Sequence, residues 1–315
     1  MSSTEQIGQS QPNAGRGMAR GLTLLTFKCE GACRLGVKTV LGILDVPDAA
    51  RRLGVLAPSD MDELLQNEDG IRLQRLVETA LESAAARPAF LDPAGIEYGP
   101  VVNRPEKILC VGLNFRQHAA EIGKPAPPFP VVFGKFNNVL NHHQGVITLP
   151  VEAATKFDYE AELVIVMGRR ARNVTEADAL DYVAGYCTGN DFSARDAQSL
   201  PGGQWLLGKT SDGFAPLGPY LVTADQVDPD NLRIECRVNG ETRQNSSTND
   251  FIFTPRQVIS YISRFLTLKA GDIIFTGTPQ GVILGYPAER QAWLKAGDTV
   301  ACSVEKLGEL EFRLA

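Results

Sequence analysis

Short apolar runs separated by glycine and proline make up most of the chain from residue 107 to its C-terminal end. The 315 residues include 30 glycines and 19 prolines, and these residues interrupt the backbone at short intervals. Many short strands with turn residues between them favour a β-rich roll or sandwich, whereas a wound parallel sheet would need helices between its strands. We therefore expect an α+β protein that is mainly β.

The composition of the chain divides it into three parts. Residues 1–17 are rich in Ser, Gln, Asn and Gly and are expected to be disordered. Residues 18–103 predict a small N-terminal α+β domain, with two or three strands in residues 22–46 and helices in residues 60–87 after a possible cap at Ser59. Residues 104–315 then form the large domain.

One helix of the large domain is well marked by its N-terminal residues. Thr254 is a suitable cap, Pro255 fits the first helical position, and Gln257 completes a capping box. The apolar residues that follow are expected to form one stripe that faces the core. They are Val258, Ile259, Ile262, Phe265 and Leu266.

Three carboxylates are spaced so that they can meet. Residues 157–168 read as a strand, on which Glu160 and Glu162 share one face at about 7 Å separation. Residues 183–191 read as a second strand that ends in Asp191. Buried carboxylates need a cationic partner, either a Lys or Arg side chain or a metal ion. Because all the ligand atoms are oxygen, Mg²⁺, Mn²⁺ or Ca²⁺ is favoured over zinc.

A histidine and a glutamate lie one helical turn apart upstream of these carboxylates. Residues 107–111 read as a strand, and Asn114 is the expected N-cap of a helix that carries His118 and Glu121. Residues three apart lie on one helical face. A carboxylate beside an imidazole stabilises its charged form, as a general base that activates water requires. A surface ion pair is the alternative.

At these residues the chain resembles the fumarylacetoacetate hydrolase family, over most of residues 107–314. The matching segments include VGLN at residues 111–114, DYEAE at 158–162, NDFSARD at 190–196, GK at 208–209 and TGTPQGV at 276–282. The order and spacing of these segments are more specific than any single one. The resemblance implies a mixed β-sandwich roll as the catalytic domain, which in this family is usually dimeric.

The resemblance also implies roles for individual residues. Glu160, Glu162 and Asp191 match the metal ligands of the family, and His118 with Glu121 matches a water-activating dyad on a mobile lid. Lys209 matches a catalytic cation. The positions that hold the carboxylate and oxo groups of the substrate are Arg195, Gln198 and Thr278.

A metal-dependent hydrolase follows as the predicted function. It would cleave a carbon–carbon bond of a 2,4-dioxo acid of the acylpyruvate type through an enolate, with Mg²⁺ or Mn²⁺ as cofactor. An oxaloacetate-type decarboxylase or a hydroxy-dienoate isomerase is the alternative within the family. A catalytically silent small-molecule binder is the alternative outside enzymes. The expected partners are a small oxo-acid substrate and a second copy of the chain.

The remaining composition excludes several other classes. A net charge of −6 argues against nucleic-acid binding, and no run approaches the roughly 20 apolar residues of a membrane span. We therefore expect a cytoplasmic protein without a membrane partner. The six scattered cysteines predict free thiols rather than a zinc site. His142 and His143 are expected in a loop, with substrate contact as the alternative.

Overall fold

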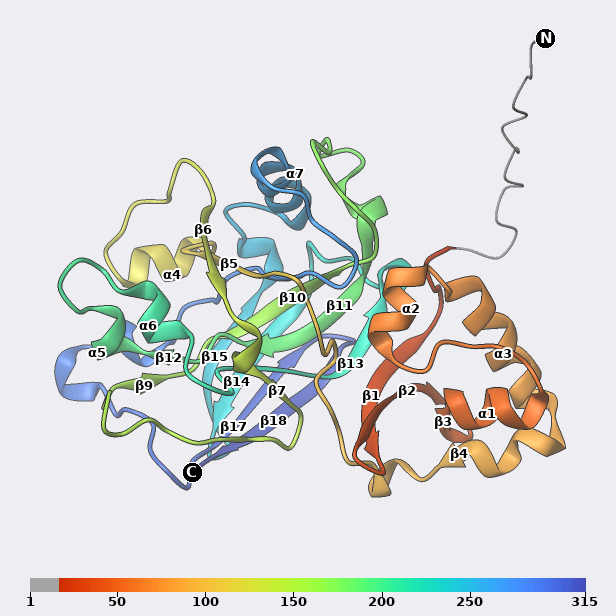
Figure 1. Cartoon of the computed structure of the whole chain (residues 1–315). Helices are drawn as coiled ribbons and strands as arrows, with labels where there is room; N and C mark the ends of the chain where they lie inside the picture. The colour runs from red at the N-terminus through yellow and green to blue at the C-terminus, as the bar shows by residue number, and fades with distance from the viewer. Residues whose placement is uncertain (1–16) are drawn as a thin grey trace, which may run out of the picture.

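The structure is a computed structural model that describes residues 17–315 (Figure 1). The predicted disorder of residues 1–17 therefore falls outside the described residues, apart from Gly17. Gly17 forms an isolated parallel bridge with Asp69.

Within residues 17–315, one large sheet of eleven strands runs through the molecule. Its order is β4-β3-β2-β1-β13-β11-β10-β16-β5-β6, and β7 pairs with β13 beside this path. The strands are β1 (Thr23–Cys29), β2 (Ala32–Thr39), β3 (Gly42–Asp45), β4 (Phe90–Leu91), β5 (Ile108–Gly112), β6 (Val131–Lys135), β7 (Leu140–His142), β10 (Ala161–Met167), β11 (Val183–Asn190), β13 (Ala215–Thr223) and β16 (Ile273–Phe275). Most pairs are antiparallel, whereas β5–β16 and β7–β13 are parallel.

A second sheet of five strands lies against the large one, next to β11 and β13 (Figure 1). Its strands, in order, are β15 (Glu241–Ser247), β14 (Arg233–Val238), β17 (Thr299–Val304), β18 (Gly308–Leu314) and β8 (Val146–Ile147). In β14 and β17 every second residue is buried, as expected for a sheet with one face on the core. β10 and β11 are buried at every residue. The predicted α+β, mainly β, fold is confirmed.

The N-terminal part contains three strands within residues 22–46, as expected, and three helices: α1 (Val46–Leu53), α2 (Met61–Asn67) and α3 (Gly70–Glu82). These elements lie together at one end of the molecule (Figure 1). β1 pairs with β13, so the N-terminal strands extend the large sheet instead of forming one of their own. The domain boundary at residues 103 and 104 stays a prediction.

Two expected helix caps are wrong. Asp60, not Ser59, caps α2, because its carboxylate accepts the Glu63 N–H at 2.8 Å, while Ser59 donates to the Glu63 carboxylate. Asn114 does not cap α4 (Arg116–Glu121), where Phe115 takes that position. The Asn114 side chain is buried and bonds the backbone at Phe253 and Thr276, which joins three segments beside the site.

The helix predicted after Thr254 is present as α7 (Pro255–Phe265), and the Thr254 N–H donates to Gln257 Oε1 at 2.9 Å. Val258, Ile259 and Ile262 are buried. Phe265 is 70% exposed, so its place in the core stripe is wrong. It ends the helix, and its ring packs against Tyr261 instead of the core.

Two further findings concern the whole described chain. All six cysteines are free, and Cys110, Cys187, Cys236 and Cys302 are buried. Within residues 17–315, no helix combines the length and the apolar composition needed to cross a bilayer.

Candidate metal centre and active site

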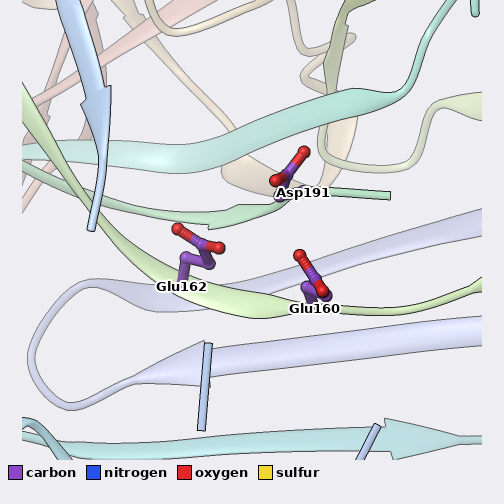
Figure 2. A group of neighbouring side chains, drawn as sticks. All are labelled: Glu160, Glu162 and Asp191. Carbon is purple, nitrogen blue, oxygen red and sulfur yellow. The ribbon is translucent and has the colours of Figure 1, made fainter. Parts of the chain in front are cut away.

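The three predicted carboxylates meet where β10 and β11 lie side by side. Each of Glu160, Glu162 and Asp191 is buried and offers an oxygen that lies within 4.8 Å of the others. Figure 2 shows their carboxylates around one common space. Ala161 pairs with Asn190 between the two strands. Glu160 and Glu162, the neighbours of Ala161, therefore lie close to Asp191, the neighbour of Asn190.

The strand expected over residues 157–168 is interrupted at this point, between β9 (Phe157–Asp158) and β10. Side chains accept the backbone N–H groups of two residues there. The Glu160 N–H donates to Asn190 Oδ1 at 3.3 Å, and the Ala161 N–H donates to Gln244 Oε1 at 3.0 Å. β9 pairs instead with the short strand β12 (Ser193–Ala194).

Three cationic side chains surround the carboxylates. Lys209, at the end of α6 (Trp205–Lys209), donates from Nζ to Glu160 Oε2 at 2.6 Å and to Asp191 Oδ2 at 2.9 Å. Lys135 donates to Asp191 Oδ1 at 2.5 Å. Arg195 donates from Nη2 to Glu160 Oε1 at 2.6 Å. Both oxygens of Glu160 and both oxygens of Asp191 therefore face a cation.

Glu162 differs from the other two carboxylates. Within the described residues it forms no ion pair, and its one bonded partner is the Gly277 N–H, which donates to Oε2 at 2.7 Å. Burial raises the pKa of Glu162 well above its usual range, and the charges of Asp191 and Glu160 add to this. Burial also raises the pKa of Glu160, but Arg195 and Lys209 outweigh it and bring that pKa to about 2.

These observations test whether a divalent cation fits. With all four buried carboxylates ionised, those of Asp158, Glu160, Glu162 and Asp191, the three cations Lys135, Arg195 and Lys209 leave one negative charge uncompensated. Bonds of about 2.0–2.6 Å to a hard cation place two ligand oxygens at most about 4–5 Å apart. The carboxylates lie within that distance, so the donor set fits Mg²⁺, Mn²⁺ or Ca²⁺.

His118 and Glu121 lie on α4, with 3.4 Å between His118 Nδ1 and Glu121 Oε2. The Gly281 N–H donates to both oxygens of Glu121, at 3.0 and 3.2 Å. Gly285 lies so close that a side chain there would meet the Glu121 carboxylate at 2.4 Å. The glutamate is therefore held in place on a glycine-containing loop, while the buried imidazole borders the cavity of the site.

The predicted substrate-binding residues already have partners. Arg195 and Gln198 are the first and last residues of α5 (Arg195–Gln198), and Arg195 Nη1 donates to Gln198 Oε1 at 3.1 Å. The Thr278 hydroxyl donates to the Ala161 carbonyl at 2.9 Å and accepts from Gln244 Nε2 at 2.9 Å. Thr278 therefore links β10 to the Gly-Thr-Pro turn, and contact with a substrate carboxylate stays a prediction.

A cavity of about 420 Å³ brings these side chains together. Of the nine site residues predicted from the sequence, eight line it, and Glu121 is the exception because it faces the glycine loop. The eight are His118, Glu160, Glu162, Asp191, Arg195, Gln198, Lys209 and Thr278. One wall is apolar, where Trp205 meets Phe133 edge-on at 5.3 Å and covers Gly112.

His142 and His143 are absent from the lining of this cavity. His142 is the last residue of β7 rather than a loop residue, whereas His143 lies in the turn that follows, as expected. His143 Nδ1 accepts the Glu311 N–H at 3.1 Å, and its ring lies edge-on to Tyr98. Both are therefore packed into the framework away from the site, and the alternative of substrate contact finds no support.

Sequence reasoning missed two residues of the site. Lys135 lies on β6 and reaches Asp191 across 56 residues of sequence, so no local spacing indicates the pair. Asp158 belongs to the same DYEAE segment as the predicted ligands, and its place in that segment was the available signal. It is fully buried and accepts a hydrogen bond from Arg195 Nε at 2.8 Å.

Comparisons with known proteins find a matching family model and similar full-length relatives. Residues 107–315 match the family model described as "Fumarylacetoacetate (FAA) hydrolase C-terminal". A fumarylacetoacetate hydrolase domain-containing protein 2 homolog of Dictyostelium discoideum is 40% identical over 308 residues, which covers 94% of this chain and 97% of that protein. A mitochondrial oxaloacetate tautomerase of Bos taurus is 43% identical over 253 residues, 80% of this chain and 78% of that protein.

Solved structures are similar to this chain over most of its length. A putative HpcE protein from Mycobacterium smegmatis superposes with a TM-score of 0.78 at 36% identity, covering 93% of this chain and 99% of that one. A fumarylacetoacetate hydrolase from Exiguobacterium antarcticum has a TM-score of 0.75 at 29% identity, with the same coverage.

Proposed function

Since the chain belongs to the fumarylacetoacetate hydrolase family, we propose that it is a metal-dependent enzyme that moves a proton on a short 2-oxo acid, with tautomerisation of oxaloacetate as its first candidate reaction. One observation carries the proposal: three buried carboxylates, of which Glu162 has no ion pair within the described residues, share a cavity with His118. The name of the Bos taurus relative, an oxaloacetate tautomerase, supports the choice of substrate.

Mg²⁺ or Mn²⁺ would be held by Glu160, Glu162 and Asp191. When bound, the cation supplies Lewis-acid stabilisation of negative charge on the 2-oxo group. Lys209 lies beside the same carboxylates, and its ammonium adds positive charge on that side of the cavity. Arg195 and Gln198 would orient the carboxylate next to the 2-oxo group.

His118 would be the base. Its Nδ1 faces Glu121, which leaves Nε2 free to take the proton from C3 of the keto form. The electron pair of the broken C–H bond forms the C2–C3 double bond, and a proton is delivered to the C2 oxygen to give the enol. Glu121 stabilises the charged imidazole between these two proton transfers.

A second candidate is hydrolysis of an acylpyruvate, and the His118–Glu121 pair favours it, because the same base can take a proton from water. The hydroxide adds to the distal carbonyl, the carbon–carbon bond breaks, and the enol of pyruvate and a carboxylic acid are released. Decarboxylation of oxaloacetate also leaves the enolate of pyruvate, with release of CO₂. Isomerisation of a hydroxy-dienoate would pass through a longer dienolate that keeps every carbon.

The test uses chelator-treated protein with oxaloacetate and with acetylpyruvate, each with and without Mg²⁺ or Mn²⁺. Metal-dependent decay of the ultraviolet absorbance of enol-oxaloacetate, without release of pyruvate, is the expected result. Pyruvate from acetylpyruvate would establish the hydrolase instead, and pyruvate from oxaloacetate alone the decarboxylase. No turnover of either compound would favour an isomerase or a silent binder.

Two further expectations belong to this proposal. We propose a homodimer in solution, which light scattering during size-exclusion chromatography would test. The cytoplasmic location stays a prediction from the sequence, since a mitochondrial location appears in the names of several relatives and is said of those proteins alone. Fractionation of cells that express the full chain would test it.

A further inference from the structure

Asp158 has four hydrogen-bond donors around one fully buried carboxylate. Oδ1 accepts the N–H groups of Tyr159 at 3.0 Å and Ile283 at 2.8 Å. Oδ2 accepts the Leu284 N–H at 3.1 Å and Arg195 Nε at 2.8 Å. Asp158 lies outside the cavity that holds the candidate metal ligands, so its bonds connect parts of the framework around that cavity.

On one side of Asp158 is the guanidinium of Arg195. Its Nε is bonded to Asp158, Nη1 to Gln198 and Nη2 to Glu160. Arg195 lines the cavity, and the proposed function assigns it to the substrate carboxylate. The bond to Asp158 therefore sets how the plane of this guanidinium lies within the cavity.

On the other side of Asp158 is the loop that receives Glu121. We name residues 281–285 the α4 seat, because Gly281 donates to the Glu121 carboxylate and Gly285 leaves space for it. Two backbone N–H groups in the middle of this seat, those of Ile283 and Leu284, are bonded to Asp158. The seat thus lies between Asp158 and the helix that carries His118.

We propose that Asp158 is a positioning residue that couples the orientation of Arg195 to the α4 seat, and through Glu121 to the placement of His118. The chain of contacts is continuous: Arg195 to Asp158, Asp158 to the seat, the seat to Glu121, and Glu121 to His118. This coupling rests on the proposed function in one respect, the assignment of the substrate carboxylate to Arg195. The placement of the base at the site then depends on the residue that orients the substrate.

Asp158→Asn is the sharpest variant, because it preserves shape and changes hydrogen bonding. Each carboxylate oxygen of Asp158 accepts two N–H groups, so in either orientation the new amide NH₂ faces two donors. Hydrogen–deuterium exchange of the full chain, free of metal and substrate, then reports on the seat and on α4 separately. Asp181→Asn, at an exposed position, is the matched control.

We expect about tenfold faster exchange in the α4 seat and in α4 of Asp158→Asn, with β10 unchanged. Faster exchange in the seat but not in α4 would overturn the coupling, as would no change in either. Faster exchange throughout β10 would show a merely structural role and would also overturn it. The control should exchange as the unaltered protein does.

Arg195→Lys tests the same coupling from its other end, and it remains available if Asp158→Asn does not fold. It keeps the positive charge but removes the Nε–H that bonds Asp158. We expect faster exchange in α4, although residue 195 does not touch that helix through any of its hydrogen bonds, and unchanged exchange there would contradict the proposal.

Steady-state kinetics add a second test, because a merely structural role of Asp158 would not lower kcat selectively relative to KM. With oxaloacetate and Mg²⁺, Asp158→Asn should lower kcat by more than it changes KM, because the base is misplaced more than the substrate. Equal changes in both would count against the coupling. If the unaltered protein does not turn over oxaloacetate, the proposed function fails, whereas the exchange experiments still decide the coupling.

Discussion

The backbone N–H of Asp191 donates a 2.9 Å hydrogen bond to the carbonyl oxygen of Glu160. Two of the three candidate metal ligands are therefore placed relative to each other by the main chain, independently of any ion. The side chains add to this arrangement, since Lys209 joins Glu160 Oε2 to Asp191 Oδ2. The candidate centre is thus preorganised, but among the described residues Glu162 has no cationic partner.

Glu162→Gln should stabilise the metal-free protein and abolish its stabilisation by Mg²⁺ or Mn²⁺. It removes a buried carboxylate without a cationic partner, and the Gln carbonyl can still accept the Gly277 N–H. We expect the free energy of unfolding at neutral pH with chelator present to rise by on the order of 1 kcal/mol or more. Urea unfolding with and without metal measures both effects, and Glu152→Gln, at an exposed position, is the control.

The stabilisation of the metal-free protein by Glu162→Gln should also increase with pH. The pKa of Glu162 is raised well above its usual range by burial and by Asp191 and Glu160, so the folded state binds this proton more tightly than the unfolded state. The stability of the metal-free protein therefore falls as pH rises above the unfolded pKa of about 4.3 toward the raised folded value. A difference between variant and unaltered protein that is constant with pH would contradict this assignment.

Lys135→Met should destabilise the metal-free protein by about 3–5 kcal/mol, because it leaves Asp191 with one cation instead of two in a fully buried place. Divalent metal should restore part of the loss, since it replaces the missing positive charge. Thermal unfolding with chelator and with Mg²⁺ measures this, with Lys295→Met at an exposed position as control. An equal loss under both conditions would show that Lys135 acts by packing alone.

His118→Ala should lower turnover by about 10²–10⁴-fold while leaving stabilisation by Mg²⁺ unchanged. The imidazole borders the cavity but is not among the three carboxylates that would hold the ion. Steady-state kinetics and thermal unfolding separate the two effects. His143→Gln, which changes a histidine outside the cavity, should keep full activity, and normal turnover in His118→Ala would rule out the dyad.

Gly285→Ala should reduce kcat without changing affinity for the metal. A methyl group at this position would approach the Glu121 carboxylate to 2.4 Å and displace it. Gly95→Ala is a suitable control, since nothing lies within 4 Å of a side chain there. Kinetics and metal titration of both variants check the prediction. A Gly285→Ala enzyme with normal kcat would show that turnover does not depend on how the α4 seat holds Glu121.

The sequence predicted those parts of the site that depend on local spacing. Glu160 and Glu162 share a face because strand side chains alternate, and His118 and Glu121 share a face because three residues make nearly one helical turn. Lys135 and the glycines at 281 and 285 could not be found in this way. They reach the site only through strand pairing and loop placement, which connect residues far apart in sequence.

Errors in the local structure have a similar origin. Asn114 looks like a helix cap by residue type, but its buried side chain has better partners in Phe253 and Thr276, which tertiary structure brings to it. Phe265 fits an apolar stripe by periodicity, yet it lies at the end of α7 beyond the edge of the core. In both cases the position of the side chain depends on which distant residues pack against it, and residue type and periodicity carry no information about those residues.

The most direct test of the metal centre is a crystal structure of the protein grown with Mn²⁺, with anomalous scattering recorded to locate the ion. The account predicts one anomalous peak bonded to oxygens of Glu160, Glu162 and Asp191, with Lys209 moved away from at least one of its two carboxylate partners. No peak between these carboxylates at saturating Mn²⁺, with Lys209 still bonded to both, would contradict it.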